Sequence, residues 1–208
     1  MLSFHEIFIV FFITLGPVKL LMLFVRLTTN AGDDLRRSLA WKSFTFSTIV
    51  LFSVALFGVG LVERWKISAP ALMIAAGVIL FIWSVDTLGQ IGKSTPPPPP
   101  DHPSAALAVI PLAVPGIITP YGVAAVLLFA MSPRAQSIPG LVTILVLLLT
   151  VMVLNLFSML GSRRLLKVVG GPVTMQLAGA VLGVLQAALA VQIILNALVR
   201  LGVPGKIS

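Results

Sequence analysis

The sequence predicts an all-α polytopic membrane protein with six transmembrane helices, arranged as two inverted repeats of three helices with broken first and fourth helices. Composition predicts a membrane protein: 58% of the residues are hydrophobic, 10% are charged, and the mean hydropathy is +1.11. Soluble domains have roughly 45–50% apolar and about 25% charged residues, so the bilayer is the solvent of this chain. The repeat rests on two hydrophobic segments, half a chain apart, that are each interrupted near the middle by proline.

Six apolar segments are long enough to cross the hydrocarbon core, which needs about 20 helical residues. They are residues 4–27, 39–62, 68–89, 106–132, 138–160 and 172–200. The stretches between them, including 28–38 and 161–171, are interpreted as connections. Because residues 1–6 contain no basic region, the first span is expected to stay in the protein.

A proline-rich linker divides the chain. Residues 93–105 contain five consecutive prolines, Pro96–Pro100, which favour a stiff extended stretch. We interpret it as a spacer between two units, 1–92 and 106–208, of one integrated membrane domain; a proline-rich ligand for a partner is the alternative. Because three spans is an odd number, the second unit enters the membrane from the opposite side, and both termini lie on one face.

The basic residues predict which face is cytoplasmic. One face carries eight of them: Arg26, Arg36, Arg37, Lys42, Lys93, Arg163, Arg164 and Lys167. The other face carries five: Arg64, Lys66, Arg134, Arg200 and Lys206. Because cytoplasmic loops are enriched in Lys and Arg, the first face is predicted to be cytoplasmic and both termini external.

The proline interruptions mark the candidate site. The first span is broken at Gly16-Pro17, and the fourth at Thr119-Pro120 after two earlier prolines. Proline in a helix interior removes one backbone donor and clashes with the carbonyl one turn back. In hydrocarbon the freed groups need partners inside the protein or in a water-filled cavity. We therefore expect Pro17 and Pro120 to lie close together near the midplane, beside a polar cavity.

Three polar residues inside the spans have two interpretations each. Lys19 follows Pro17, where a charge costs at least about 2.5–3.5 kcal/mol. It is either a counter-charge or proton site for transport, or a structural lysine that reaches an interface or pairs with a carboxylate such as Asp86. Asp86 is either a coupling-ion carboxylate or an interfacial residue beside Trp83. Asn155 either lines a pathway or bonds a neighbouring helix.

The last span is patterned at four-residue spacing. Gly179, Gly183 and Ala187 form a row of small residues, and both glycines are predicted to lie against another helix. A second row contains Gln176, Ala180, Val184, Ala188, Gln192 and Asn196. Such rows lie along one helix face, turned inward or toward a second copy, so a homo-oligomer is one expectation.

Catalytic and cofactor motifs are missing. The chain has no cysteine, and His5 and His102 lack metal-ligand spacing. It contains no nucleophile elbow, no phosphate-binding glycine loop ending in Gly-Lys and no His-Glu-x-x-His. We therefore predict no catalytic residue, no metal, no cofactor and no enzymatic activity. The net charge of +8 is attributed to basic loops facing anionic membrane lipids, with no nucleic acid as partner.

Four stretches carry a family resemblance over nearly the whole chain. Residues 16–22, with Leu27-Thr28 after them, are similar to the pattern Asn-Pro-x-Gly-x-x-Pro, and residues 111–121 are similar to Pro-Leu-x-x-Pro-x-x-x-Gly-Pro-Gly. Residues 75–81 and 187–196 match a third-span glycine segment and a sixth-span ending. In these stretches the chain resembles the MarC family (LysE/MarC-type) of six-span inner-membrane proteins, which is also grouped with neutral amino-acid transporters.

The departures from the family pattern fall at the breaks. Gly16, Lys19 and Met22 stand where the family has Asn, Gly and Pro. Thr119 and Tyr121 replace the two glycines that flank Pro120. The apolar spans therefore match the family, while the residues at the predicted site differ from its pattern. The glycine and alanine substrates that the resemblance implies are therefore not expected to carry over to this chain.

These observations predict an inner-membrane secondary transporter of a small polar solute, with an amino acid as the leading candidate. Alternating access would operate around a midplane site, with proton or sodium coupling left open. Half-helix N-termini after each break would offer amides to a carboxylate. The predicted solute-binding residues are Gly16, Pro17, Lys19, Thr119, Pro120, Tyr121 and Gly122. The alternative is a non-transporting assembly or lipid-handling membrane protein.

Overall fold

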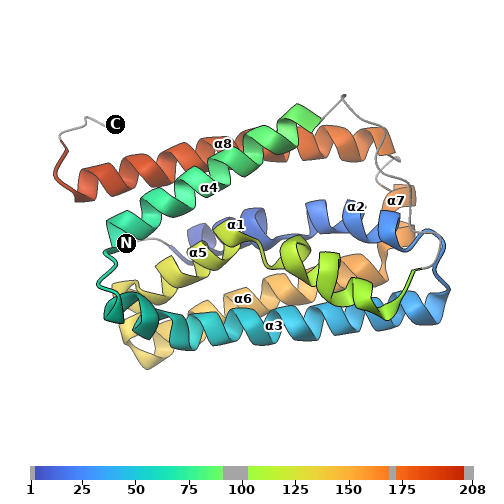
Figure 1. Cartoon of the computed structure of the whole chain (residues 1–208), viewed down its shortest axis with the longest axis horizontal. Coiled ribbons are helices and arrows are strands. Elements are labelled where there is room, and N and C mark those ends of the chain that lie inside the picture. Colours follow the sequence, from blue (N-terminus) through green and yellow to red (C-terminus); the bar gives the residue numbers. More distant parts are fainter. Residues whose placement is uncertain (1–2, 91–102, 169–171, 204–208) are drawn as a thin grey trace.

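A computed structural model describes residues 3–90, 103–168 and 172–203, and within these ranges the chain is helical without a strand (Figure 1). Five helical segments are long and apolar enough to cross a membrane, and a bent pair of segments makes a sixth. This confirms an all-α polytopic membrane protein. The prolines Pro96–Pro100 lie outside the described residues.

The first three crossings follow the predicted spans. α1 (Phe4–Leu15) and α2 (Pro17–Leu27) together form the first, α3 (Asp33–Arg64) the second and α4 (Ala69–Gln90) the third. The second span was predicted as 39–62, but its helix begins at Asp33. Asp33 and Asp34 lie in its first turn, where acidic side chains stabilise the positive end of the helix dipole.

The remaining crossings come after the linker. The fourth is η1 (Ala105–Ala108), η2 (Val109–Ile117) and α5 (Pro120–Ala130), bent by 60° before α5. η3 (Pro133–Gln136) leads to α6 (Ile138–Leu160), and α7 (Ser162–Val168) leads to α8 (Pro172–Arg200). The segment 161–171, predicted as a connection, contains the short helix α7 between the spans α6 and α8. Residues near the two termini lie at the same end of the molecule (Figure 1).

Proline explains why the fourth crossing is irregular. Ile110 and Val114 have extended backbones, with φ and ψ of −123° and 122°, and −124° and 120°. Each precedes a proline, Pro111 or Pro115, whose ring disfavours the helical region for the residue before it. The helical path is therefore interrupted twice before the break at Thr119-Pro120, which confirms that the fourth span is broken.

The helices form two layers (Figure 1). α4 and α8 pack along each other as one layer, called here the α4–α8 layer. The main layer holds α1, α2, α3, η2, α5 and α6, and it contains most of the core, including Phe11, Phe24, Leu51, Leu148 and Val151. A smaller buried cluster joins the two layers through Leu80, Tyr121 and Ala190.

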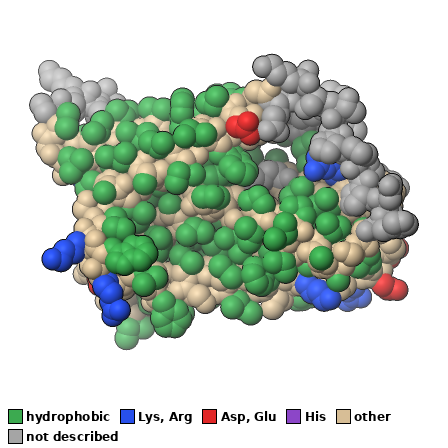
Figure 2. All heavy atoms as spheres, in the orientation of Figure 1, with side chains coloured by type: hydrophobic (Ala, Val, Ile, Leu, Met, Phe, Trp, Pro, Cys, Tyr) green, Lys and Arg blue, Asp and Glu red, His purple; other side chains and the backbone are tan. Residues whose placement is uncertain are grey.

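The outside of the molecule is apolar, as a lipid-facing surface requires. Figure 2 shows hydrophobic side chains over the middle of the face in view, while Lys and Arg gather near its two ends. Large side chains such as Phe57, Ile82 and Ile138 are exposed. A soluble protein would bury residues of this kind, so they are suited to contact with acyl chains.

Glycines set how closely α4 approaches α8. A Cβ atom added to Gly77 would lie 2.9 Å from the Ala190 carbonyl oxygen of α8. A Cβ on Gly183 would lie 2.9 Å from Leu88 Cδ2, which confirms the predicted helix contact there. The same prediction for Gly179 was wrong within this chain, because no atom of the described residues lies within 4 Å of its Cβ position. The regular spacing of the row therefore does not mean uniform packing.

Replacing Gly77 with leucine is expected to destabilise the protein by roughly 1–3 kcal/mol, because the side chain would overpack the α4–α8 contact. The measurement is thermal unfolding in detergent. Gly179→Leu is the matched control on α8, and it should unfold at the unmodified temperature. Equal stability of both variants would show that α4 and α8 do not approach this closely.

Candidate functional site

The first span contains a helix end inside the membrane. α1 ends at Leu15, Gly16 is extended with φ −78° and ψ 174°, and Pro17 begins α2. The last four carbonyl groups of a helix lack partners in that helix. At this depth no bulk water can bond them, so they need partners within the protein.

Three of those carbonyls accept hydrogen bonds from side chains of three distant segments, called here the three capping side chains. The bonds run from Gln186 Nε2 to Ile13 O (2.8 Å), from Thr119 Oγ1 to Thr14 O (3.3 Å) and from Asn155 Nδ2 to Leu15 O (2.7 Å). All three side chains are buried. The broken helix end is therefore satisfied by tertiary structure.

Thr119 joins the two breaks directly. Its hydroxyl donates to Thr14 O at the end of α1 and accepts from the Gly122 amide (3.1 Å) at the start of α5. Its side chain has no exposed surface. The sequence prediction that the two breaks lie close together is confirmed.

Two glycines leave room at the breaks. A Cβ on Gly16 would lie 1.7 Å from the Phe12 carbonyl oxygen, so the turn from α1 into Gly16 has no space for a side chain. A Cβ on Gly122 would lie 2.3 Å from Leu15 Cδ2, so a larger residue there would displace the Leu15 side chain at the contact between α5 and α1.

Two separate cavities lie between the layers on either side of the breaks. The terminal-side cavity, about 440 Å³, extends from Glu6 and Arg200 near the chain termini inward to Thr14 and Tyr121. Its walls come from α1, α4, α5 and α8, and are mostly apolar. The prediction of a polar cavity beside the breaks was therefore wrong, because apolar helix faces line most of this space.

The linker-side cavity, about 390 Å³, extends toward the opposite end of the molecule. It is lined by Val18, Met22, Leu23, Trp83, Thr87, Pro111, Pro115, Gly116, Gly179, Leu182 and Gln186. Gly179 borders this space, which explains why no described residue packs on it.

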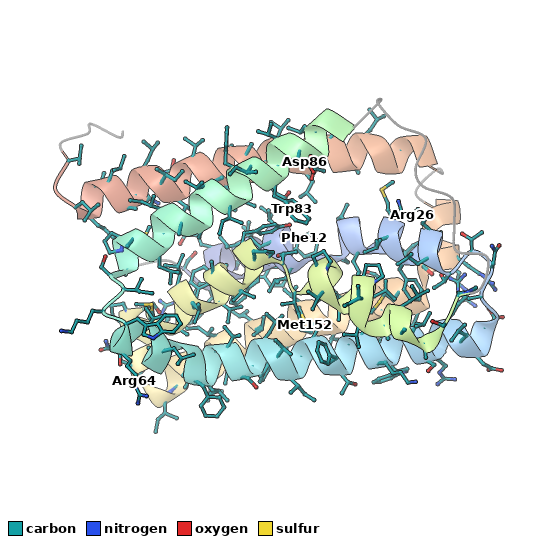
Figure 3. The ribbon with its side chains drawn as sticks, in the orientation of Figure 1. Phe12, Arg26, Arg64, Trp83, Asp86 and Met152 are labelled. Atoms are coloured by element: carbon teal, nitrogen blue, oxygen red, sulfur yellow. The ribbon has the colours of Figure 1, made fainter. Side chains whose placement is uncertain are left out.

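Side chains from both layers separate the two cavities. The rings of Trp83, which lines the linker-side cavity, and Tyr121, which lines the terminal-side cavity, meet edge to face with centroids 6.0 Å apart. Gln186 lines the linker-side cavity and bonds Ile13 next to Thr14. Figure 3 shows Trp83 projecting from α4 toward the main layer. These residues join the two layers and form a thin barrier between the two cavities.

The predicted site residues have different places. Gly16, Thr119 and Gly122 are buried in the packing of the breaks, Tyr121 lines a cavity, and Pro120 is exposed. Pro17 is half-buried at the start of α2. The backbone of Lys19 lies in the first turn of α2, and its side chain is outside the described part of the structure. A solute-binding role for these residues stays a prediction.

Sequence reasoning missed Gln186. Of the two interpretations given for Asn155, the bond to a neighbouring helix is the one that the structure shows. Both residues are amides within apolar segments of the sequence, and this pattern was the signal available for Gln186. Both side chains are buried in the structure. Oδ1 of Asn155 is buried without a hydrogen-bond partner among the described residues. Asp86 is exposed near the end of α4 (Figure 3), and both of its interpretations stay predictions.

Replacing Asn155 with leucine is expected to lower the free energy of unfolding by about 1–3 kcal/mol, because Leu15 O would lose its buried donor. Thr150→Val is the matched control on α6, since Thr150 is exposed and bonds only Val146 O of its own helix (2.8 Å). Thermal unfolding in detergent measures both. If Asn155→Leu were as stable as Thr150→Val, the cap would contribute nothing.

Comparison with known proteins places the chain in a family. A family model described as MarC family integral membrane protein matches residues 1–201. A UPF0056 membrane protein of Pyrococcus abyssi is 24% identical over 194 residues, covering 93% of both chains. One of Methanocaldococcus jannaschii is 26% identical over 200 residues, covering 94% of this chain and 93% of its own.

A third relative, a UPF0056 membrane protein of Archaeoglobus fulgidus, is 31% identical over 85 residues, which are 41% of this chain and 40% of its own. No solved structure matches the chain. The family match extends over both broken spans and all six crossings described above. The chain belongs to the MarC family of integral membrane proteins.

Proposed function

We propose that this protein is a secondary transporter that carries an amphipathic solute, with an amino acid as the leading candidate, by alternating access across the bacterial or archaeal inner membrane. One observation carries the proposal: two cavities approach paired helix breaks from opposite ends, with a thin barrier between them. Transporters with broken helices bind solute at the midplane and expose it alternately to each side.

The barrier suggests which parts move. The α4–α8 layer is held together by the close contact at Gly77, and the main layer by its extensive core. The contacts that divide the cavities, Trp83 with Tyr121 and Gln186 with Ile13, join one layer to the other. Rocking of one layer against the other would therefore open one cavity toward the barrier while the other closes.

The breaks supply polar groups for a solute. Gly16 caps α2 without a side chain and Pro17 has no amide, so the first-turn amides of α2 are available to a carboxylate. Lys19 in that turn would add positive charge.

The terminal-side cavity favours a solute with an apolar body. A glycine-sized solute would leave most of about 440 Å³ unfilled and place polar groups against apolar walls. An apolar side chain would gain about 25 cal/mol for each Å² it removes from water. We therefore propose large neutral amino acids as better substrates than glycine or alanine.

The helix contacts support the proposed inverted repeat. α1 of the first span packs against α5 of the fourth, α3 against α6, and α4 against α8. Each span of the first unit therefore contacts the corresponding span of the second. A twofold relation in the membrane plane would produce pairings of this kind. Rocking of the two layers would then exchange equivalent environments.

Counterflow into proteoliposomes should show exchange of labelled leucine or phenylalanine that exceeds exchange of glycine. Ala76→Phe should abolish it, because Ala76 lines the terminal-side cavity and a phenyl group would fill it. Ala75→Phe is the matched control, since Ala75 is the neighbouring exposed residue of α4. Imposed proton and sodium gradients identify the coupling ion.

Preferred exchange of glycine and alanine would contradict the proposed solute size and leave transport intact. Absence of exchange for every amino acid would contradict transport of amino acids. Undiminished exchange by Ala76→Phe would show that the terminal-side cavity is not on the solute path.

A further inference from the structure

A small basic cavity lies away from the solute path, at the end of the molecule opposite the termini. It has a volume of about 210 Å³ between the start of α3 and the turn from α6 to α7. We call it the arginine pocket; its lining residues are Asp33, Arg36, Arg37, Met159, Leu160 and Arg163. Figure 2 shows Lys and Arg side chains gathered near this end.

Arg36 is held in place before any ligand binds. Its Nη2 donates to the buried Ser162 hydroxyl (2.7 Å), and its guanidinium carbon lies 5.8 Å from the centroid of the Phe24 ring. The side chain is half-buried. A guanidinium fixed by a hydrogen bond and an aromatic ring loses little conformational entropy when it binds an anion.

The pocket has more positive charge than its own carboxylate neutralises. Three guanidinium groups line it, and the single lining carboxylate, Asp33, pairs with Arg163 (Nη1 to Oδ1, 2.6 Å). Like charges that converge on one small space repel each other, and a bound anion relieves that repulsion. The planar guanidinium fork matches two oxygens of a phosphate group, so phosphate is the anion that this geometry suits.

We propose that the arginine pocket binds a phosphate group, either that of an anionic phospholipid or free inorganic phosphate. The apolar part of the lining, Met159 and Leu160, is the end of the transmembrane helix α6, so a lipid phosphate would sit at headgroup depth. Arg36 and Arg37 belong to α3, and Arg163 to α7. Bound phosphate would therefore connect the first half of the chain to the second at this face.

The test is titration of the full-length protein in detergent, with thermal unfolding as readout. The ligands are phosphatidylglycerol, inorganic phosphate and diacylglycerol, which lacks phosphate. We expect phosphatidylglycerol or inorganic phosphate to raise the unfolding temperature, and diacylglycerol to have no effect. Stabilisation by phosphatidylglycerol alone identifies a lipid site, and equal stabilisation by inorganic phosphate identifies a free-phosphate site. No stabilisation by either overturns the proposal.

Variants locate the effect. Arg36→Gln and Arg37→Gln should each raise the apparent Kd about tenfold or more, as loss of a charge-assisted bond predicts. Arg37 is exposed, so its variant is expected to fold even if Arg36→Gln does not. Arg64→Gln, at the other end of α3, is the matched control and should bind normally. Normal binding by Arg37→Gln and Arg36→Gln would overturn the proposal, as would loss of binding by Arg64→Gln.

Asp33→Asn separates ligand binding from a purely structural ion pair. Removing the competing carboxylate frees Arg163, so the apparent Kd for phosphate should fall severalfold. If the pocket only held a structural pair, the same variant would leave the phosphate response unchanged. An unchanged or weaker response in Asp33→Asn would contradict the site.

Discussion

An open helix end within hydrocarbon is the constraint on which this structure depends. α1 stops at Leu15, and the carbonyls of its last turn cannot be hydrated by bulk solvent. The chain satisfies them with side chains from the N-cap of α5, from α6 and from α8, which are far apart in sequence. The second irregular segment is treated in the same way, since the Ser43 hydroxyl lies 2.8 Å from Ala108 O. Buried polar residues in this protein therefore fix which helices meet.

The same bonds bear on how the protein moves. Of the three capping side chains, Thr119 and Asn155 belong to the main layer and Gln186 to the α4–α8 layer. Separation of the layers would break the Gln186 bond and leave Ile13 O at the edge of a cavity, where water can replace the lost donor. The hydrogen bonds from Thr119 and Asn155 to the end of α1 would stay intact. A helix end capped partly from each layer can thus support motion without exposing carbonyls to lipid.

Proline and glycine made the main features predictable from sequence. Pro17 and Pro120 located both breaks, and apolar length located six crossings, because these signals act through local backbone chemistry. Gln186 could not be assigned a partner, since a periodic helix does not reveal which face meets α1. Gly179 and Gly183 share one row, yet Gly183 packs on Leu88 of α4 while Gly179 borders the linker-side cavity. Which residues of a regular row meet a neighbouring helix depends on where the helices cross, and this has no local sequence signal.

The most direct test of alternating access is to measure from which side of the membrane each cavity can be reached. The chain has no native cysteine, so a single introduced cysteine is the only site that a thiol reagent can label. Val10 lines the terminal-side cavity and Val18 the linker-side cavity, on the two halves of the first span. Val10→Cys and Val18→Cys would be labelled with a membrane-impermeant thiol reagent in oriented proteoliposomes. Alternating access predicts that each cysteine is labelled mainly from its own side, and that substrate changes the balance between them. Labelling of both from one side, or of neither from either side, would contradict it.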